Sequence, residues 1–226
     1  SKRNRYQSRN LKMNQTIDLL TSHRSIRKFT DEPVDPDLFT RLVDAAQASA
    51  SSSFLQGVTI IRVTDPGKRV ALRDVAGGQA YVETAPEFLV FCADLSRPMR
   101  CCRQHGGTPA EGLTEQFVIA TVDAALYAQN LVIAAESAGL GICYIGALRN
   151  DPAKVTELLD LPQQVYPVFG LCFGHPAQDP EVKPRLPVSV TLKTDSYSTD
   201  GEDEAIAAYD EELSLIHISE PTRRLV

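Results

Sequence analysis

The sequence lacks several features on which whole classes of function depend. It has no excess of positive charge, because 23 Lys and Arg residues stand against 29 Asp and Glu residues, giving a formal net charge of -6 at pH 7. A basic surface is what holds nucleic acid or an acidic membrane face, so we expect neither partner. The sequence also lacks the Gly-x-Gly-x-x-Gly motif of a dinucleotide-binding domain, which argues against a Rossmann dehydrogenase.

Secretion signals and zinc motifs are missing as well. No apolar segment follows the N-terminus, and no run of ~18 apolar residues exists, so we expect neither secretion nor a membrane span. The five cysteines lack paired Cys-x-x-Cys spacing, which favours reduced thiols in a cytoplasmic protein. Cys101, Cys102 and His105 form a cluster without a second ligand pair, so we assign them to a loop and expect no metal.

What is present is the composition of one globular domain, with 43% hydrophobic and 23% charged residues in a chain of 226. Both ends look foreign to that domain. Residues 1–12 are polar and cationic, whereas Met13 precedes a helix, so we expect the domain to begin at Met13; the alternative is a basic binding arm.

The other end, Leu213 to Arg223, resembles the in-frame translation of a transposase adapter used to prepare sequencing libraries. We therefore expect an upstream extension at 1–12, the domain at 13–212 without its native C-terminal arm, and adapter sequence at 213–226, and we exclude His217 from any catalytic role.

Hydrophobic periodicity predicts an alternation of helices and strands. Helices are expected at 15–20, 37–48, 68–75, 114–138, 152–159 and 202–212, and strands at 58–63, 88–93, 142–145 and 165–173. This pattern predicts an α+β fold, a central mixed or antiparallel sheet flanked by helices. The helix at 114–138 is apolar on most of its circumference, so we expect it to be buried on all sides, as the spine of the domain or as half of a dimer interface. Its polar residues make it unsuitable for lipid.

Two motifs suit an anion. His23, Arg24, Ser25 and Arg27 place cations and a hydroxyl within one helical turn and its approach, which fits a phosphate or an ordinary solvated loop. Further along, Lys183 and Arg185 flank Pro184 in an extended segment and point the same way, which fits a second anion clamp or a solvated face.

Two further motifs suit a flat ring. The serines of Ala50–Phe54 have hydroxyls and N–H groups that fit the pyrimidine edge of a flavin, or a surface linker. The stretch Tyr144–Gly146 ends a short strand, and its glycine lets the backbone approach a flat ligand, or simply forms a turn.

Taken together and in order, the motifs resemble one known group. H-R-S-I-R-K-F-T-D-E-P, S-S-S-F-L-Q, G-G-Q, A-A-E-S-x-G-L-G, Y-I-G-x-L-R-N and K-P-R-L-P are similar to the oxygen-insensitive NADPH nitroreductase and flavin reductase branch of the nitroreductase superfamily. The resemblance runs from about Gln15 to Glu212. It implies a homodimer of α+β subunits with FMN at the interface and NADPH as electron donor.

The resemblance also implies roles for residues. Phe54 would lie beside the substrate pocket, and no residue is itself catalytic because the chemistry takes place at N5 of FMN. Ala50 and Ala147 depart from the usual serine and glycine, which affects substrate preference more than flavin binding. The implied FMN contacts are His23, Arg24, Ser25, Ile26, Arg27, Ser51, Ser52, Ser53, Gln79, Tyr144, Ile145, Gly146, Ala147, Lys183 and Arg185.

The implied activity is two-electron reduction of nitroaromatics, quinones or related acceptors. One alternative is an NAD(P)H:flavin oxidoreductase that supplies reduced FMN to another enzyme. A second, of another class, is a flavin-binding protein without turnover, or an inactive fragment. Because the family's arm carries arginines for the 2′-phosphate of NADPH, we expect weaker dimers and poorer NADPH preference without it.

Overall fold

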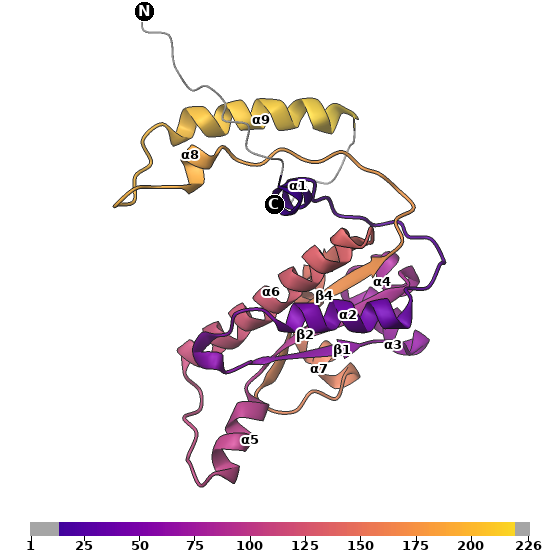
Figure 1. The fold of residues 1–226 in the computed structure, drawn as a ribbon, viewed down its shortest axis with the longest axis vertical. Coiled ribbons are helices and arrows are strands. Elements are labelled where there is room, and N and C mark those ends of the chain that lie inside the picture. Colours follow the sequence, from indigo (N-terminus) through magenta and orange to yellow (C-terminus); the bar gives the residue numbers. More distant parts are fainter. Residues whose placement is uncertain (1–13, 220–226) are drawn as a thin grey trace, which may run out of the picture. The chain divides into compact units, whose positions relative to one another are not determined.

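The computed structural model describes residues 14–219, which form two compact units, one ending at Pro180 and one beginning at Glu181 (Figure 1). The first unit contains a four-stranded sheet of β1 (Val58–Arg62), β2 (Glu87–Asp94), β3 (Gly141–Ile145) and β4 (Val165–Gly174). Its helices are α1 (Gln15–Thr21), α2 (Pro36–Gln47), α3 (Pro66–Val75), α4 (Tyr81–Thr84), α5 (Ser96–Gln104), α6 (Thr114–Ser137) and α7 (Pro152–Leu158), with 3-10 turns at Ser52–Phe54 and Gly146–Asn150.

The sheet has the order β1-β2-β4-β3, and each neighbouring pair is antiparallel. Its strands are runs of β-branched and aromatic residues, which suit a pleated surface. Every residue of β2 is buried, and its pairing with β4 shifts register between Phe91 and Cys92. The α+β class and all four predicted strands are confirmed.

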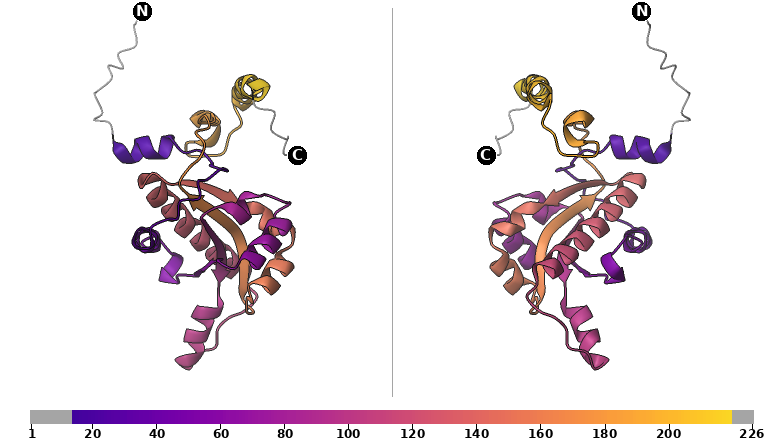
Figure 2. Two further views of the ribbon diagram at one scale, coloured as in Figure 1. Left: turned by 90° about the vertical axis from the view of Figure 1, so that its right-hand side faces the viewer. Right: turned by 90° about the vertical axis from the view of Figure 1, so that its left-hand side faces the viewer.

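Helices cover both faces of this sheet (Figure 2). On one face α2 and α6 enclose an apolar core that includes Leu42, Phe91 and Leu131. On the other face α3, α4 and α7 enclose a second core that includes Leu72, Phe88 and Val155. Each helix therefore buries one apolar face against the sheet, as a layered fold requires.

Three helices begin at an Asp-Pro pair. Asp35, Asp65 and Asp151 each accept a hydrogen bond from backbone N–H groups of the first turn, and the proline that follows occupies the first helical position. Proline suits that position because its missing N–H would be unpaired there in any case. This local chemistry explains why α2, α3 and α7 start where they do.

The expectation that α6 is buried on all sides is wrong for the single chain. One face, which includes Ala124, Ala128 and Leu131, is fully buried, whereas Val122 and Leu126 are 47% and 41% exposed. By length and composition alone α6 could cross a membrane, but here it packs on the sheet. An apolar stripe on its outer face is left without a partner in the described part of the chain.

Two further expectations are corrected. Cys101 and Cys102 lie in α5 and not in a loop, with His105 as the C-terminal cap of that helix. The run from His23 is not a helical turn but an extended segment, because Ser25 bridges Ile142 of β3. All five cysteines are free, and the described residues contain no group of three or more side chains suited to a metal. Met13, residues 1–12 and residues 220–226 lie outside the described residues.

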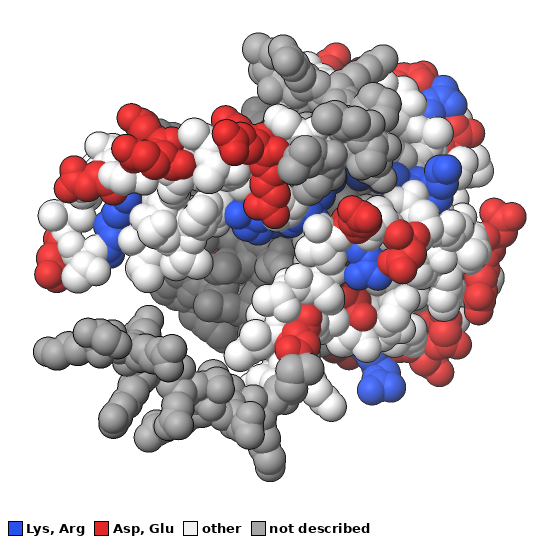
Figure 3. Space-filling view, turned by 90° about the horizontal axis from the view of Figure 1, so that it is seen from above, with Lys and Arg blue, Asp and Glu red and all other residues white. Residues whose placement is uncertain are grey.

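The second unit contains α8 (Val188–Thr191) and α9 (Glu202–Ser219). Within it, Lys193 pairs with Glu202 at 2.6 Å, and the Tyr209 hydroxyl donates to the Pro184 carbonyl at 3.5 Å. Acidic side chains gather along α9 (red in Figure 3). The predicted helix is present and continues through residue 212, so the proposed domain boundary there stays a prediction.

Candidate functional site

The first candidate group lies in the extended segment after α1. His23 contacts the Glu136 carboxylate at 2.6 Å, and the Arg24 guanidinium donates to the Asp179 carboxylate and, at 3.0 Å, to the Ser22 carbonyl. The Nε atom of Arg24 is buried and has no hydrogen-bond partner among the described residues. Since a buried charged donor is rarely left unpaired, this atom points to a missing acceptor.

A cavity of about 580 Å³ adjoins this group. It is lined by Leu19 of α1, by Ser22 at the C-terminal cap of that helix, by Arg24, by Glu136 of α6 and by Gly141 of β3. The cavity therefore lies between the segment that follows α1 and the C-terminal end of α6. Its wall includes the Arg24 guanidinium, whose Nε–H has no acceptor among the described residues. Its two carboxylates, Glu136 and Asp179, are already paired with His23 and Arg24.

The segment continues as a partial strand beside β3. The Ile26 amide donates to the Ile142 carbonyl at 2.8 Å, and the Ile26 side chain is only 5% exposed. A Cβ at Gly141 would meet Ile26 at 2.6 Å, so glycine is required for the two segments to approach. Ile26 thus contributes backbone and packing, whereas Arg27 next to it is exposed.

Arg27 lies near Tyr81, and Tyr81 in turn joins it to Gln79. The Tyr81 hydroxyl donates to the Gln79 side-chain carbonyl, whose amide donates to the Ala76 carbonyl at 2.9 Å. Burial raises the pKa of Tyr81, Cys143 raises it further, and Arg27 partly offsets both. The structure therefore brings Arg27 and Gln79 together, through a tyrosine that the sequence motifs did not single out.

The stretch at the end of β3 supplies mostly backbone. Ile145 is fully buried, whereas Gly146 and Ala147 are half-buried in the 3-10 turn. The Tyr144 hydroxyl donates to the Gln129 side chain at 3.4 Å, and burial, aided by Glu136, raises the pKa of Tyr144. A Cβ at Gly146 would lie 3.1 Å from the Arg149 guanidinium, so this turn has little room for a side chain.

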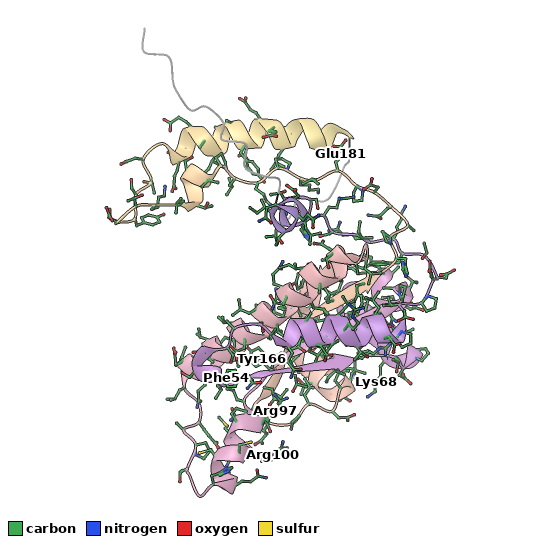
Figure 4. The ribbon with its side chains drawn as sticks, viewed as in Figure 1. Phe54, Lys68, Arg97, Arg100, Tyr166 and Glu181 are labelled. Carbon is green, nitrogen blue, oxygen red and sulfur yellow. The ribbon has the colours of Figure 1, made fainter. Side chains whose placement is uncertain are left out.

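The serine loop, defined here as Ser51–Gln56, contacts α6 at Asp123, well before the C-terminal end of that helix where His23 contacts Glu136. Its hydroxyls differ in their use: Ser51 donates to the Asp123 carboxylate at 2.6 Å and accepts from the Gln56 amide at 2.7 Å. Ser52 and Ser53 are exposed, and Phe54 is 81% exposed. Figure 4 shows Phe54 at the end of this unit where α5 begins.

Asp123 is a further residue of this site that the motifs did not single out as a candidate. It lies on α6, is only 2% exposed, and accepts from the amides of Ser52 at 3.3 Å and Gly57 at 2.9 Å. Opposite it, Arg97 donates to the Gln56 carbonyl at 3.2 Å and pairs with Asp94. The available signal was a carboxylate at a position that helical spacing places on the buried face of α6.

The candidate residues do not all meet in one chain. His23 is anchored at Glu136 and the serine loop at Asp123, positions that lie about 20 Å apart along α6 at a rise of about 1.5 Å per residue. Lys183 and Arg185 are exposed in the second unit. In one chain, the cationic residues that suit an anion therefore lie at one end of α6. The serine loop, whose exposed hydroxyls suit the edge of a flavin ring, lies toward the other end.

Comparison with known proteins gives a consistent result. A model described as "Nitroreductase family" matches residues 20–175, and one described as "Nitroreductase family, C-terminal domain" matches residues 183–220. The chain is 46% identical over 207 residues to an oxygen-insensitive NADPH nitroreductase of Salmonella typhimurium, covering 92% of this chain and 84% of that protein.

Two further proteins show the same likeness. The chain is 46% identical over 206 residues to an FMN reductase (NADPH) of Bacillus subtilis, covering 89% of this chain and 83% of that protein. Among solved structures, the NADPH:FMN oxidoreductase of Vibrio harveyi in complex with NAD+ is similar with a TM-score of 0.84 and 46% identity, covering 89% of this chain and 86% of that one.

Proposed function

Because this chain belongs to the nitroreductase family, we propose that it is an FMN-dependent NADPH oxidoreductase that reduces nitroaromatics, quinones or related acceptors by two-electron transfer. The observation that carries the proposal is the buried, unpaired Arg24 Nε atom at the wall of the cavity after α1. A phosphate is the acceptor that a guanidinium fork suits best. The residues present therefore fit the phosphate of a flavin mononucleotide.

The ring of the mononucleotide is assigned to the turn after β3 and to side chains around it. Gly146 keeps a side chain out of that turn, so backbone atoms can approach a flat group. Gln79 has its amide fixed by the Ala76 carbonyl and its oxygen fixed by Tyr81, so its orientation is set in advance. Ser52 and Ser53 are exposed, so their hydroxyls are accessible to the ring edge.

When bound, FMN supplies the ring atom that accepts a hydride from NADPH and passes the electrons on. The chain's residues bind and orient the reactants. His23, Arg24 and Arg27 hold negative charge, and Phe54 presents an aromatic face beside the ring for the acceptor. Lys183 and Arg185 are assigned to the phosphate and ribityl chain on the basis of the K-P-R-L-P motif. Holding the two reactants in contact supplies the entropic part of the rate enhancement in such a site.

We further propose that the enzyme is a homodimer assembled on the outer stripe of α6. Val118, Val122 and Leu126, each four residues apart, are large apolar side chains that stand exposed along one face of this helix, and such patches mark interfaces. In a two-fold pair each chain uses the same surface. We propose a two-fold axis that runs across α6, which makes the two α6 helices antiparallel. The serine loop of one chain then turns toward the His23 end of the other, which reunites the two halves of the site.

The alternative within this class is a flavin reductase that supplies reduced FMN to another enzyme. It has support, because an FMN reductase (NADPH) and an NADPH-flavin oxidoreductase are also 46% identical to this chain. The ratio of kcat/KM for free FMN to kcat/KM for a nitrofuran or quinone decides between the two. We assign the enzyme to the cytoplasm, in keeping with five free cysteines.

Anaerobic mixing tests the proposal. After incubation with FMN and removal of unbound FMN by gel filtration, the purified chain should be yellow. It should lose its flavin absorbance when NADPH is added, and a nitroarene should restore that absorbance. A protein that binds FMN but stays yellow with NADPH is a flavin-binding protein without turnover. A protein that is colourless after incubation with FMN and removal of unbound FMN has no electron carrier, and that result contradicts the proposal.

A further inference from the structure

The serine loop has a strained backbone. Ser53, Phe54 and Gln56 have φ values of 50°, 56° and 54°, in the left-handed region that residues with a side chain rarely adopt. Three such residues in one short loop do not persist unless the surroundings hold them there. The loop therefore needs an anchor outside its own sequence.

Asp123 supplies this anchor at both ends of the loop. One carboxylate accepts from the Ser51 hydroxyl and the Ser52 amide where the loop begins, and from the Gly57 amide where it ends. Binding both ends to one group fixes the distance between them. Gly57 itself packs against α6, since a Cβ built there would lie 3.4 Å from Ala120, at the edge of ordinary van der Waals contact.

Packing and helix formation give no reason for an acid at this position. Asp123 is 2% exposed and lies on the buried face of an apolar helix, where an alanine or leucine would cost nothing in desolvation. Its three partners in the described part of the chain are uncharged groups of the loop and of Gly57. The carboxylate is thus matched to the loop and to nothing else that the structure describes.

We propose that Asp123 is a positioning residue for FMN binding: it does not touch the cofactor, but holds the serine loop so that Ser52 and Ser53 face the flavin ring. This inference rests on the proposed function. It also divides the serines, since the Ser51 hydroxyl is used within the loop whereas the other two are free for the ring. Arg97 supports the same conformation through the Gln56 carbonyl.

The test compares Asp123→Asn with a matched control, Glu87→Gln. Glu87 is a buried carboxylate of β2 that pairs with Arg62 away from the loop. Because hydrogen bonds to a charged group contribute more than neutral ones, we expect Asp123→Asn to raise the Kd for FMN about tenfold, measured by quenching of FMN fluorescence. Glu87→Gln should change this Kd by less than about twofold.

Two readouts separate positioning from general damage. Riboflavin has the ring but no phosphate, so Asp123→Asn should raise the Kd for riboflavin and the Kd for FMN by the same factor. Hydrogen exchange should increase at the Ser52 and Gly57 amides and not in β2. Ser51→Ala removes only one of the donors to Asp123 and should raise the Kd for FMN less than Asp123→Asn does. In the double variant the two effects should be less than additive, because both act through one contact.

The outcomes are distinct. Unchanged FMN affinity in Asp123→Asn, or additive effects with Ser51→Ala, overturns the role of Asp123 while leaving the proposed function intact. A wild-type protein that fails to bind FMN overturns both. If Asp123→Asn does not fold, Ser51→Ala decides alone: an unchanged Kd for riboflavin contradicts the proposal, and a raised Kd supports it.

Discussion

At the scale of single residues, Arg24 is the residue on which the proposed binding of the FMN phosphate most depends. Two of its nitrogens are paired with Ser22 and Asp179, and the third is buried without a partner. We expect Arg24→Ala to raise the Kd for FMN by about tenfold or more, because a charge-assisted bond to phosphate is lost. Riboflavin affinity should stay unchanged. Fluorescence titration with both ligands measures this, and an equal loss for both would place Arg24 at the ring instead.

Tyr166 gives a prediction about alkaline pH. It stacks on Phe117 at 4.9 Å between ring centroids and contacts the Thr121 hydroxyl, and burial raises its pKa from an ordinary value of 10.0 to about 12. Below pH 10 the hydroxyl is protonated in both states. Between pH 10 and about 12 only the unfolded state releases the proton, so stability falls as pH rises.

Tyr166→Phe should remove this part of the pH dependence. The free energy of unfolding of the variant, measured by urea titration, should decline less steeply than that of the wild type between pH 10 and 12. The two slopes should agree between pH 7 and 9. Parallel curves over the whole range would show that the Tyr166 hydroxyl titrates alike in both states.

At the scale of elements, the outer stripe of α6 makes the next prediction. Leu126→Arg places a charge in the proposed contact between two chains, where desolvation opposes it. We expect the dissociation constant of the dimer to rise at least tenfold, as measured by analytical ultracentrifugation over a range of protein concentrations. Ala153→Arg, on the exposed side of α7, is the matched control and should leave the association state unchanged. A Leu126→Arg protein that associates as the wild type does would move the interface elsewhere.

Local sequence rules predicted most elements and missed those held by distant contacts. The four strands, α6 and the Asp-Pro helix starts follow from short-range patterns. The helix α5 is missed from sequence because it is rich in arginine and contains few apolar residues. Its Met99 is buried, and Arg97 donates to the carbonyls of Gln56 and Val58. These partners are far away in sequence, so no local window contains them.

The candidate site shows the same division. The family motifs identify candidate site residues, but they do not show which contacts fix the positions of those residues. His23 was placed on a helical turn, whereas pairing of Ile26 with Ile142 makes the segment extended. From the sequence alone, Asp123 is only one of the polar residues that make α6 unsuited to lipid. Its function depends on Ser51 and Gly57, whose positions relative to α6 follow from the fold and not from spacing along the chain.

At the scale of the whole molecule, stability depends on the core between α6 and the sheet. Leu131 is fully buried there. Leu131→Ala should lower the free energy of unfolding by roughly 2–5 kcal/mol, since it leaves a cavity that the neighbours fill only in part. Leu192→Ala removes the same atoms from a side chain that is 67% exposed, and should cost less than about 1 kcal/mol.

Urea unfolding of both variants, followed by circular dichroism, measures the difference. Saturating FMN should stabilise wild type and Leu131→Ala by the same amount, about 2.7 kcal/mol at a hundredfold excess over Kd, because the core does not contact the ligand. A smaller gain in Leu131→Ala would mean that core packing and cofactor affinity are coupled.

The strand order has a consequence for synthesis on the ribosome. The first two strands can pair as soon as they emerge, but the other side of β2 finds its neighbour only when β4 has been made, after α6 and β3. Until then a strand that is apolar from Phe88 to Ala93 presents an open edge, a kind of surface on which nascent chains aggregate. Translation between Asp94 and Val165 is therefore the interval in which this polypeptide most needs a chaperone, and slow codons within it should lower the soluble yield.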